Sequence, residues 1–466
     1  MANTGSVGRL VKALLQHIEQ DGQPGEQLPT TRSLVERYAA SPVTVQKALR
    51  ELTTRGVIET RPGQGTFIAA LPTPPRAARF EWQTLVLGER PDTLDAFGTL
   101  FAPPRPDVLP LGSGYLDATL QPLTALAGAM SRAARRPGAW DRLPAEGHEG
   151  LRTWFAAQLG PGFHTRDVLI VPGGQAALST ALRALTRSGQ AVVVESPTHL
   201  GALAALRAAG LRAVPVPTDA GGLDPDRLHA ALETSGARVV LYQPLHANPT
   251  GTTLARERHA AVLQVLARHQ AYLVEDDAAR DLTLEGAPTP PLALHDDAGH
   301  VLYIRSLTKS VAPGLRVAAL VARGPVSARL RALRTADELF VPGPMQETAL
   351  EWVSSPAREA HQTRLRTHLR SRRDALLAAL ATHLPAARVT RVPRGGLFAW
   401  LELPEGSDDV QLARAALDAG VQVNPGAAWF PAEAPGPFVR LSYAAANETT
   451  LQAGVQRLAE VWTLGQ

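Results

Sequence analysis

Over the first 70 residues, apolar positions recur at helical spacing in three successive segments. One apolar face covers Val7–Ile18, and a second, shorter one covers Leu34–Tyr38. The third segment begins at Ser41-Pro42, which has the form of an N-cap followed by proline at the first helical position. The pattern therefore predicts three helices, the last of which ends near Arg55.

Two strand-like runs follow these helices, at Val57–Thr60 and Thr66–Ile68. The residues between them, Arg61-Pro62-Gly63-Gln64-Gly65, combine a proline with two glycines, which is typical of a hairpin turn. Three helices and a two-stranded hairpin are the elements of a winged helix-turn-helix. Residues 1–70 are therefore predicted to form one small domain of that type.

The pattern changes after this domain. Residues 71–105 are rich in proline and mixed in charge, which predicts a linker. Beyond them, strand-length apolar runs alternate with helical patterns such as Gln175–Thr186, Gly201–Ala209 and Arg256–His269. This alternation predicts an α/β fold with a mostly parallel sheet. The apolar runs are Val168–Val171, Ala191–Glu195, Ala213–Val216, Val239–Tyr242, Tyr272–Glu275, Val301–Ile304 and Ala318–Ala322.

This second domain is expected to cover residues 106–466 and to have two lobes. The sheet and its helices would form a large lobe over about residues 145–345. A long arginine-rich helix, two further strand patterns and a terminal helix follow, which predicts a smaller α+β lobe over about residues 346–466.

Composition narrows the classes of function. The chain has 466 residues, of which 45% are hydrophobic and 19% charged, so it can bury substantial cores. It has no cysteine, which excludes disulfides and thiolate metal sites, and no histidine cluster points to another metal site. The apolar runs are too short to span a bilayer, so no membrane partner is expected and the cytoplasm is the expected location. The net charge of +4 is too small to predict nucleic-acid binding by itself.

Lysine is scarce among the basic residues. Only three of the 47 Lys and Arg residues are lysine, namely Lys12, Lys47 and Lys309. Arginine evidently serves almost everywhere that a generic positive charge suffices. A lysine kept against this bias is a candidate for imine chemistry, because a guanidinium does not lose its proton and attack a carbonyl.

The first domain carries a local signal for DNA. Its segments Leu28–Leu34, Ser41–Leu49 and Gly63–Phe67 resemble those of GntR-type winged helices, in register over residues 6–70. The resemblance implies a double-stranded DNA operator as partner, with the third helix in the major groove and the wing near the minor groove. Pro42 stands where many members have a polar or basic residue, so base readout is expected to depend on Thr44 and Gln46. The candidate DNA contacts are Arg32, Thr44, Gln46, Gly63 and Gln64, with Lys47 and Arg50 as phosphate contacts.

The segment Ser306–Arg316, which contains Lys309, follows a predicted strand. Ligands bind at the carboxyl ends of strands in open α/β sheets. The hydroxyls of Ser306 and Thr308 and the guanidinium of Arg316 suit an anionic phosphate. Ser306-x-x-Lys309 also matches a serine β-lactamase motif, but that motif needs a later Lys-Thr-Gly, which this chain lacks.

This segment resembles the lysine segment of fold-type I pyridoxal phosphate enzymes, and other motifs of the aminotransferase fold occur in the family's order. The resemblance implies that pyridoxal phosphate forms an imine with Lys309 and that the helix opened by Gly174 and Gln175 receives the phosphate. In Asn248-Pro-Thr-Gly251, the Asn248 amide would donate to the cofactor's phenolate oxygen. In Glu275-Asp-Asp277, Asp276 would pair with the pyridine nitrogen and keep it protonated.

The resemblance extends to the predicted small lobe. Arg440, within Phe438-Val-Arg440, would grip the carboxylate of the ligand, and Asn424-Pro-Gly426 would close the same side of the pocket. A winged helix followed by an aminotransferase fold is the arrangement of the MocR subfamily of GntR regulators, and the resemblance leaves only the linker unassigned.

Two positions depart from the family pattern. Ala278 and Ala279 follow the acidic pair where close members have a tyrosine that touches the phenolate oxygen. His199, within Glu195-Ser-Pro-Thr-His199, occupies the place of the usual aromatic residue that stacks on the cofactor ring. Both changes argue against efficient transamination rather than against cofactor binding.

The expected function is that of a pyridoxal phosphate-dependent transcriptional regulator. As a homodimer it would bind operator DNA and sense an amino compound, or pyridoxal phosphate itself, through Lys309, with Arg440 engaging a carboxylate. One alternative is an active aminotransferase with an accessory DNA-binding module, which would turn over repeatedly. Another is a DNA-binding protein whose second domain is only a dimerisation scaffold, in which case regulation would survive loss of Lys309.

Overall fold

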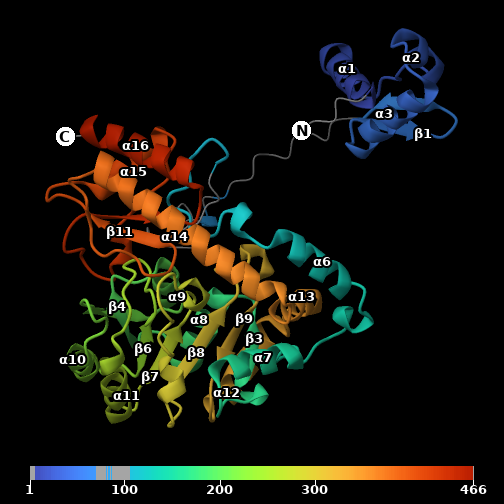
Figure 1. The fold of residues 1–466 in the computed structure, drawn as a ribbon. Coiled ribbons are helices and arrows are strands. Elements are labelled where there is room, and N and C mark those ends of the chain that lie inside the picture. The colour runs from blue at the N-terminus through green and yellow to red at the C-terminus, as the bar shows by residue number, and fades with distance from the viewer. Residues whose placement is uncertain (1–5, 70–79, 81, 84–85, 87–104, 465–466) are drawn as a thin grey trace. The chain divides into compact units, whose positions relative to one another are not determined.

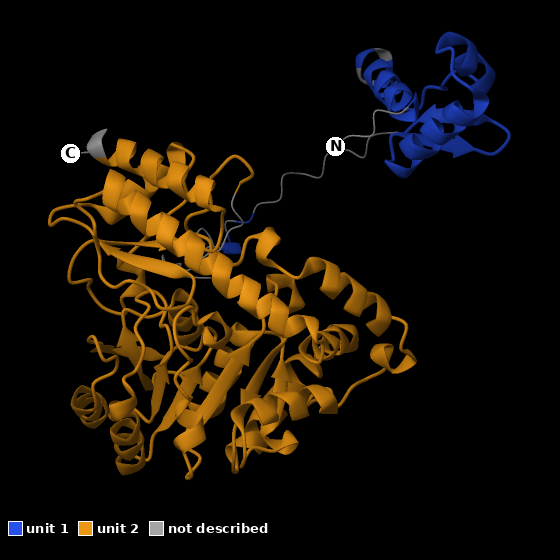
Figure 2. Ribbon diagram, in the orientation of Figure 1, with its two compact units in different colours: residues 1–91 blue, residues 92–466 orange. Residues whose placement is uncertain are grey.

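The computed structural model describes residues 6–69, 80, 82–83, 86 and 105–464. The chain forms two compact units, Met1–Pro91 and Asp92–Gln466 (Figure 2). Most of the predicted linker, residues 71–105, lies outside the described residues. No helix in the described part of the chain is both long and apolar enough to cross a lipid bilayer.

The first unit contains three helices and a hairpin. Thr30 caps the second helix through its hydroxyl, which accepts the Ser33 N–H, and Ser41 caps the third in the same way by accepting the Thr44 N–H. The hairpin pairs antiparallel, and the buried core is apolar on every element. The elements are α1 (Ser6–Asp21), α2 (Thr31–Arg37), α3 (Pro42–Thr54), β1 (Ile58–Arg61) and β2 (Gly65–Ile68).

The second unit is built on a seven-stranded sheet with the order β3-β9-β8-β7-β6-β4-β5 (Figure 1). The pairs within β4 to β8 are parallel, and β9 runs antiparallel to both of its neighbours, so the predicted mostly parallel sheet is confirmed. The strands are β3 (Val168–Val171), β4 (Ala191–Ser196), β5 (Arg212–Pro217), β6 (Val239–Tyr242), β7 (Tyr272–Asp276), β8 (Val301–Ser306) and β9 (Ala318–Val321).

Helices cover both faces of this sheet (Figure 1). Successive strand residues point to opposite faces, so Ile170 lies on the face covered by α7, α10, α11 and α13, whereas Leu169 and Val171 lie on the face covered by α8, α9 and α12. Burial on both faces explains the continuous apolar runs in the sequence. The helices are α6 (Leu123–Ala133), α7 (Glu149–Leu159), α8 (Gly174–Leu185), α9 (Leu200–Ala208), α10 (Pro225–Ser235), α11 (His259–Arg268), α12 (Val326–Glu338) and α13 (Gly343–Val353).

The small lobe has an antiparallel sheet with the order β10-β11-β13-β12, and its long helix α14 packs against α16 (Figure 1). Its core also includes Leu111 and Leu116, which precede the large lobe in sequence, and Leu109 pairs with Val421. The segment that enters the second unit is therefore anchored in the small lobe. The elements are α14 (Ala357–His383), β10 (Arg388–Val389), β11 (Phe398–Glu402), α15 (Asp409–Asp418), β12 (Asn424–Pro425), β13 (Phe438–Ser442) and α16 (Glu448–Leu464).

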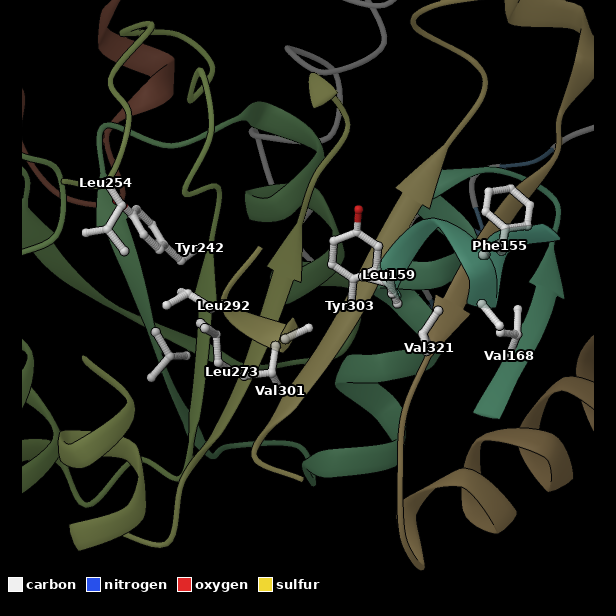
Figure 3. Packing of buried hydrophobic residues seen from close by; sticks show 14 of the residues in the cluster. Phe155, Leu159, Val168, Tyr242, Leu254, Leu273, Leu292, Val301, Tyr303 and Val321 are labelled. Carbon is white, nitrogen blue, oxygen red and sulfur yellow. The ribbon is translucent and has the colours of Figure 1, made fainter. Parts of the chain in front are cut away.

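We predict that Tyr303→Phe lowers the free energy of unfolding by about 1–3 kcal/mol, because the buried Asp277 loses a hydrogen-bond donor. The Tyr303 ring is packed in the core beneath the sheet (Figure 3), and its hydroxyl donates to Asp277 Oδ2 at 2.7 Å. Urea denaturation measures the change. Tyr272→Phe is the control, since within the described residues its hydroxyl makes no hydrogen bond, and it should change stability by no more than about 0.5 kcal/mol. Equal effects of the two substitutions would contradict the assignment.

Candidate cofactor site and DNA-binding surface

A cavity of about 460 Å³ lies at the carboxyl edge of the large sheet. The parallel strands β6, β7 and β8 end at Tyr242, Asp276 and Ser306, and residues at or just after these ends line it. This is the edge at which open α/β sheets bind ligands. Every residue predicted to contact the cofactor or the carboxylate of its ligand lines this one cavity, namely Gly174, Gln175, His199, Asn248, Asp276, Ser306, Thr308, Lys309, Arg316 and Arg440. Of the segment predicted to close the pocket, Asn424–Gly426, only Asn424 lines it.

Lys309 has no carboxylate partner among the described residues. Its Nζ donates to the Gly114 carbonyl at 2.8 Å and lies 4.0 Å from the centroid of the Tyr115 ring. Desolvation in the cavity lowers the pKa of Lys309 from 10.5 to about 8; the Arg440 cation acts in the same direction, and Asp276 opposes it. An amine with this pKa is partly unprotonated near neutral pH, as attack on a carbonyl requires.

The start of α8 and the loop after β8 supply donors at one end of the cavity. The N-cap of α8 is Gly173 (φ 98°), so no side chain caps the first N–H groups of this helix. A Cβ on Gly173 would lie 2.5 Å from Arg316 Nη2, so the glycine leaves room for the guanidinium. The Thr308 hydroxyl is buried and has no hydrogen-bond partner among the described residues. Together these groups form a donor set suited to a phosphate.

Three predicted phosphate residues already have other contacts. Arg316 Nη2 donates to the Pro172 carbonyl at 2.7 Å. Gln175 Nε2 donates to the Gly201 carbonyl at 2.8 Å, which uses one of the two N–H groups of its amide. Ser306 Oγ accepts the Thr308 N–H at 3.1 Å, and its own hydroxyl proton remains free to donate.

The acidic pair at the end of β7 is divided between the cavity and the core. Asp276 lines the cavity, and its Oδ2 accepts from Gln243 Nε2 at 2.8 Å. The Asp277 carboxylate instead pairs with Arg280 and with the Tyr303 hydroxyl. The carboxylate available to a cavity ligand is therefore that of Asp276, the residue predicted to meet the pyridine nitrogen.

Arg440 is a buried cation without a carboxylate partner in the described part of the chain. Its Cζ lies 3.9 Å and 4.3 Å from the ring centroids of Phe398 and Trp429, and Nη1 and Nη2 donate to Asn248 Oδ1 (3.1 Å) and the Gly112 carbonyl (2.7 Å). Burial lowers the pKa of Arg440 to about 9, which leaves it charged at pH 7. A buried charge that only neutral acceptors compensate favours binding of an anion.

His199 and the two alanines shape the middle of the cavity. His199 Nδ1 accepts the Ala202 N–H at 3.0 Å, which places the ring proton on Nε2, 3.4 Å from Asp276 Oδ2. Ala278 and Ala279 line the same cavity without a polar side-chain atom, so neither can replace the hydroxyl of the family's tyrosine.

The sequence prediction missed several parts of the wall, including the Phe398 and Trp429 rings that contact Arg440. The loop from Gly112 to Tyr115 supplies carbonyls to both Arg440 and Lys309. The signal in the sequence was two glycines just before an aromatic residue, Gly112-Ser-Gly-Tyr115. The structure explains the first glycine, because a Cβ on Gly112 would lie 2.9 Å from Asn424 Oδ1. Gln243 was also missed, although a polar residue directly after an apolar strand marks the same edge as Asp276.

The exposed face of α3 carries three of the seven predicted DNA contacts. Gln46, Lys47 and Arg50 are exposed and share a helical face with Val43, an unpredicted apolar residue that is 61% exposed. Arg32 on α2 is also exposed, and so are Gly63 and Gln64 at the hairpin tip, where Gln27 Nε2 donates to the Gln64 carbonyl. Thr44 is half-buried, with its hydroxyl 2.9 Å from that of Ser41, so it is the least available of the set.

The fold and these two sites define a DNA-binding module joined to a pyridoxal phosphate-type domain, and comparisons with known proteins agree. Residues 7–68 match the family of bacterial regulatory proteins of the gntR type, and residues 106–458 match aminotransferase class I and II. The chain therefore belongs to the class I and II aminotransferase family, in the arrangement with a GntR domain that characterises the MocR subfamily.

Individual relatives show both parts of this architecture. The chain is 29% identical to the HTH-type transcriptional regulator YdfD of Bacillus subtilis, over 93% of this chain and 91% of the relative. It is 30% identical to the HTH-type regulator YdcR of Escherichia coli, over 91% of each chain. The crystal structure of LysN, an α-aminoadipate aminotransferase from Thermus thermophilus complexed with N-(5'-phosphopyridoxyl)-L-leucine, superposes with a TM-score of 0.73 at 31% identity, covering 77% of this chain and 92% of that one.

We predict that the rate at which the cofactor-free protein takes up pyridoxal phosphate rises with pH and levels off above a midpoint near pH 8. Only the unprotonated amine attacks an aldehyde, and the pKa of Lys309 is lowered to about 8, so its reactive fraction saturates there. Stopped-flow absorbance between about pH 6 and 10 measures the rate. A rate that still climbs at pH 10 would show that Lys309 is not desolvated as described.

Proposed function

We propose that this protein is a transcriptional regulator that binds operator DNA through its winged helix and holds pyridoxal phosphate on Lys309 to sense an amino compound. One observation carries the proposal. The same chain has an exposed polar face on α3, the predicted recognition helix, and a cavity in which the amine of Lys309 is desolvated. When bound, pyridoxal phosphate supplies an aldehyde carbon that joins an amine and a ring that accepts electrons.

The residues of the cavity fit this cofactor. The start of α8, the buried Thr308 hydroxyl and Arg316 supply donors for its phosphate, and Asp276 supplies a carboxylate that would hold a proton at the ring nitrogen. Asn248 would donate from Nδ2 to the phenolate oxygen while its Oδ1 accepts from Arg440. This division of roles uses both ends of the Asn248 amide.

The ligand class follows from Arg440. Among the described residues its guanidinium donates hydrogen bonds only to neutral oxygens, and a carboxylate makes stronger, charge-assisted hydrogen bonds with the same N–H groups. An amino compound with a carboxylate would therefore compete with the Gly112 carbonyl for Arg440. Its amine would take the place of Lys309, which would free Nζ from its role in holding the cofactor.

These changes at Arg440 and Lys309 would affect the segment Gly112–Tyr115, near the start of the second unit. The carbonyls of Gly112 and Gly114 accept from Arg440 and Lys309. Holding the cofactor would change the contact of Lys309, and a carboxylate ligand would change that of Arg440. Ligand and DNA would then influence each other to the extent that each prefers one arrangement of this segment. In a homodimer, two winged helices would read two related half-sites.

We predict that purified wild-type protein supplied with pyridoxal phosphate develops a visible absorbance band and that borohydride converts the cofactor to a covalent adduct on Lys309. Lys309→Ala should show neither, because the remaining lysines, Lys12 and Lys47, lie in the other unit. Peptide mass spectrometry locates the adduct. An adduct on another residue, or no band in the wild type, would remove the cofactor from the proposal. Multiple turnovers with an amino acid and a keto acid would instead establish a working transaminase.

A second prediction concerns DNA. Gln46→Ala should weaken binding to a duplex selected by the wild-type protein by about 1–3 kcal/mol, with less effect on random-sequence duplex, because a base contact is lost. Arg50→Ala should weaken binding to both and reduce the salt dependence by about one counterion. Fluorescence anisotropy at several salt concentrations separates the two effects. Arg187→Ala, an exposed arginine in the second unit, is the control and should change neither.

A further inference from the structure

Gln243 occupies a central but unassigned position in the cavity. It directly follows β6, is only 8% exposed and lines the cavity between the ends of β4 and β7. A buried amide has a large desolvation cost unless its donor and acceptor both find partners. The hydrogen-bond partners of Gln243 therefore indicate its role in the cavity.

Gln243 makes three hydrogen bonds to neighbouring segments. Its backbone N–H donates to Glu195 Oε1 at 3.1 Å, its Nε2 donates to Asp276 Oδ2 at 2.8 Å, and its Oε1 accepts the Asn248 N–H at 3.0 Å. The orientation of the side-chain amide is unambiguous, because an N–H can only donate and an ionised carboxylate can only accept. One side chain thus spans from the carboxylate of Asp276 to the backbone of Asn248.

The two carboxylate oxygens of Asp276 differ in their hydrogen bonding. Oδ2 accepts from Gln243 and faces His199 Nε2 at 3.4 Å, whereas Oδ1 has no hydrogen-bond partner within the described residues. The titratable groups around this carboxylate are His199, Lys309 and Glu195, each contributed by a different segment. With Oδ2 held, Oδ1 is the oxygen available to a group in the cavity.

We propose that Gln243 is a positioning residue that fixes Asp276 and Asn248 relative to each other, so that Asp276 Oδ1 meets the ring nitrogen of pyridoxal phosphate while the Asn248 amide meets the opposite side of the ring. The inference rests on the proposed function, because it requires the cofactor to lie in this cavity. It concerns the proton at the ring nitrogen, which a protein tunes through hydrogen bonds to the carboxylate beside it.

The test is the pH dependence of the visible absorbance of the cofactor bound to Lys309, in wild type and Gln243→Leu. Leucine keeps the approximate size of the side chain but loses both hydrogen bonds. Without these hydrogen bonds Asp276 would be less well placed to keep the ring nitrogen protonated. A ring with less positive charge withdraws fewer electrons from the nitrogen joined to Lys309, so that nitrogen becomes more basic. We expect the pH midpoint to rise by about half a unit or more and the cofactor affinity to fall by about tenfold.

Two further variants keep the test decisive. Gln422→Leu removes another cavity-lining glutamine that contacts neither Asp276 nor Asn248 in the described structure, and it should leave the midpoint in place. Gln243→Asn keeps an amide but is one methylene too short to reach both partners, so it should raise the midpoint even if the leucine variant fails to fold. An unchanged or lowered midpoint in folded Gln243 variants overturns the inference alone. Absence of the band in wild type overturns the proposed function and the inference with it.

Discussion

Three cations line one cavity that has a single carboxylate among its described lining residues, and two of them, Lys309 and Arg440, are desolvated there. Lys309, Arg316 and Arg440 repel one another, and Asp276 offsets only part of their charge. Such a cavity lowers the pKa of its amine and favours anionic ligands. Its geometry depends on both lobes, since Lys309 and Asp276 lie at the edge of the large sheet and Arg440 lies on β13 of the small one. Occupation by phosphate and carboxylate groups would therefore act on the contact between the lobes.

In the proposed function, the same charges would transmit the binding of a ligand. Arg440 and Lys309 donate to the backbone carbonyls of Gly112 and Gly114, in the segment that enters the second unit and continues into the core of the small lobe. A ligand that supplies stronger acceptors would change the hydrogen-bond partners of this segment. An aminotransferase would use the binding of an amino compound to transfer its amino group. A regulator would need only the change of hydrogen-bond partners that binding causes.

Much of the fold and site could be predicted from the sequence because each part has a local signature. Strands buried on both faces are continuous apolar runs, and the predicted cofactor residues, such as Asp276, follow the ends of those runs. The loop at Gly112 and the bridging role of Gln243 could not be predicted in this way. Their contacts join segments far apart in sequence, and an isolated glycine or glutamine does not specify its partner. The exposure of Val43 is likewise set by how α3 packs, which periodicity alone describes only in part.

The most direct test of the account measures coupling between the two units. The affinity of the full-length, pyridoxal phosphate-loaded protein for a duplex selected by the wild-type chain would be determined with and without an amino acid that shifts its absorbance. The affinity for that amino acid would then be determined with and without the duplex. The account predicts that both affinities change by the same factor, typically 5- to 150-fold, and that Arg440→Ala abolishes the change. Equal affinities in all four conditions would show that the aminotransferase-type domain does not regulate DNA binding.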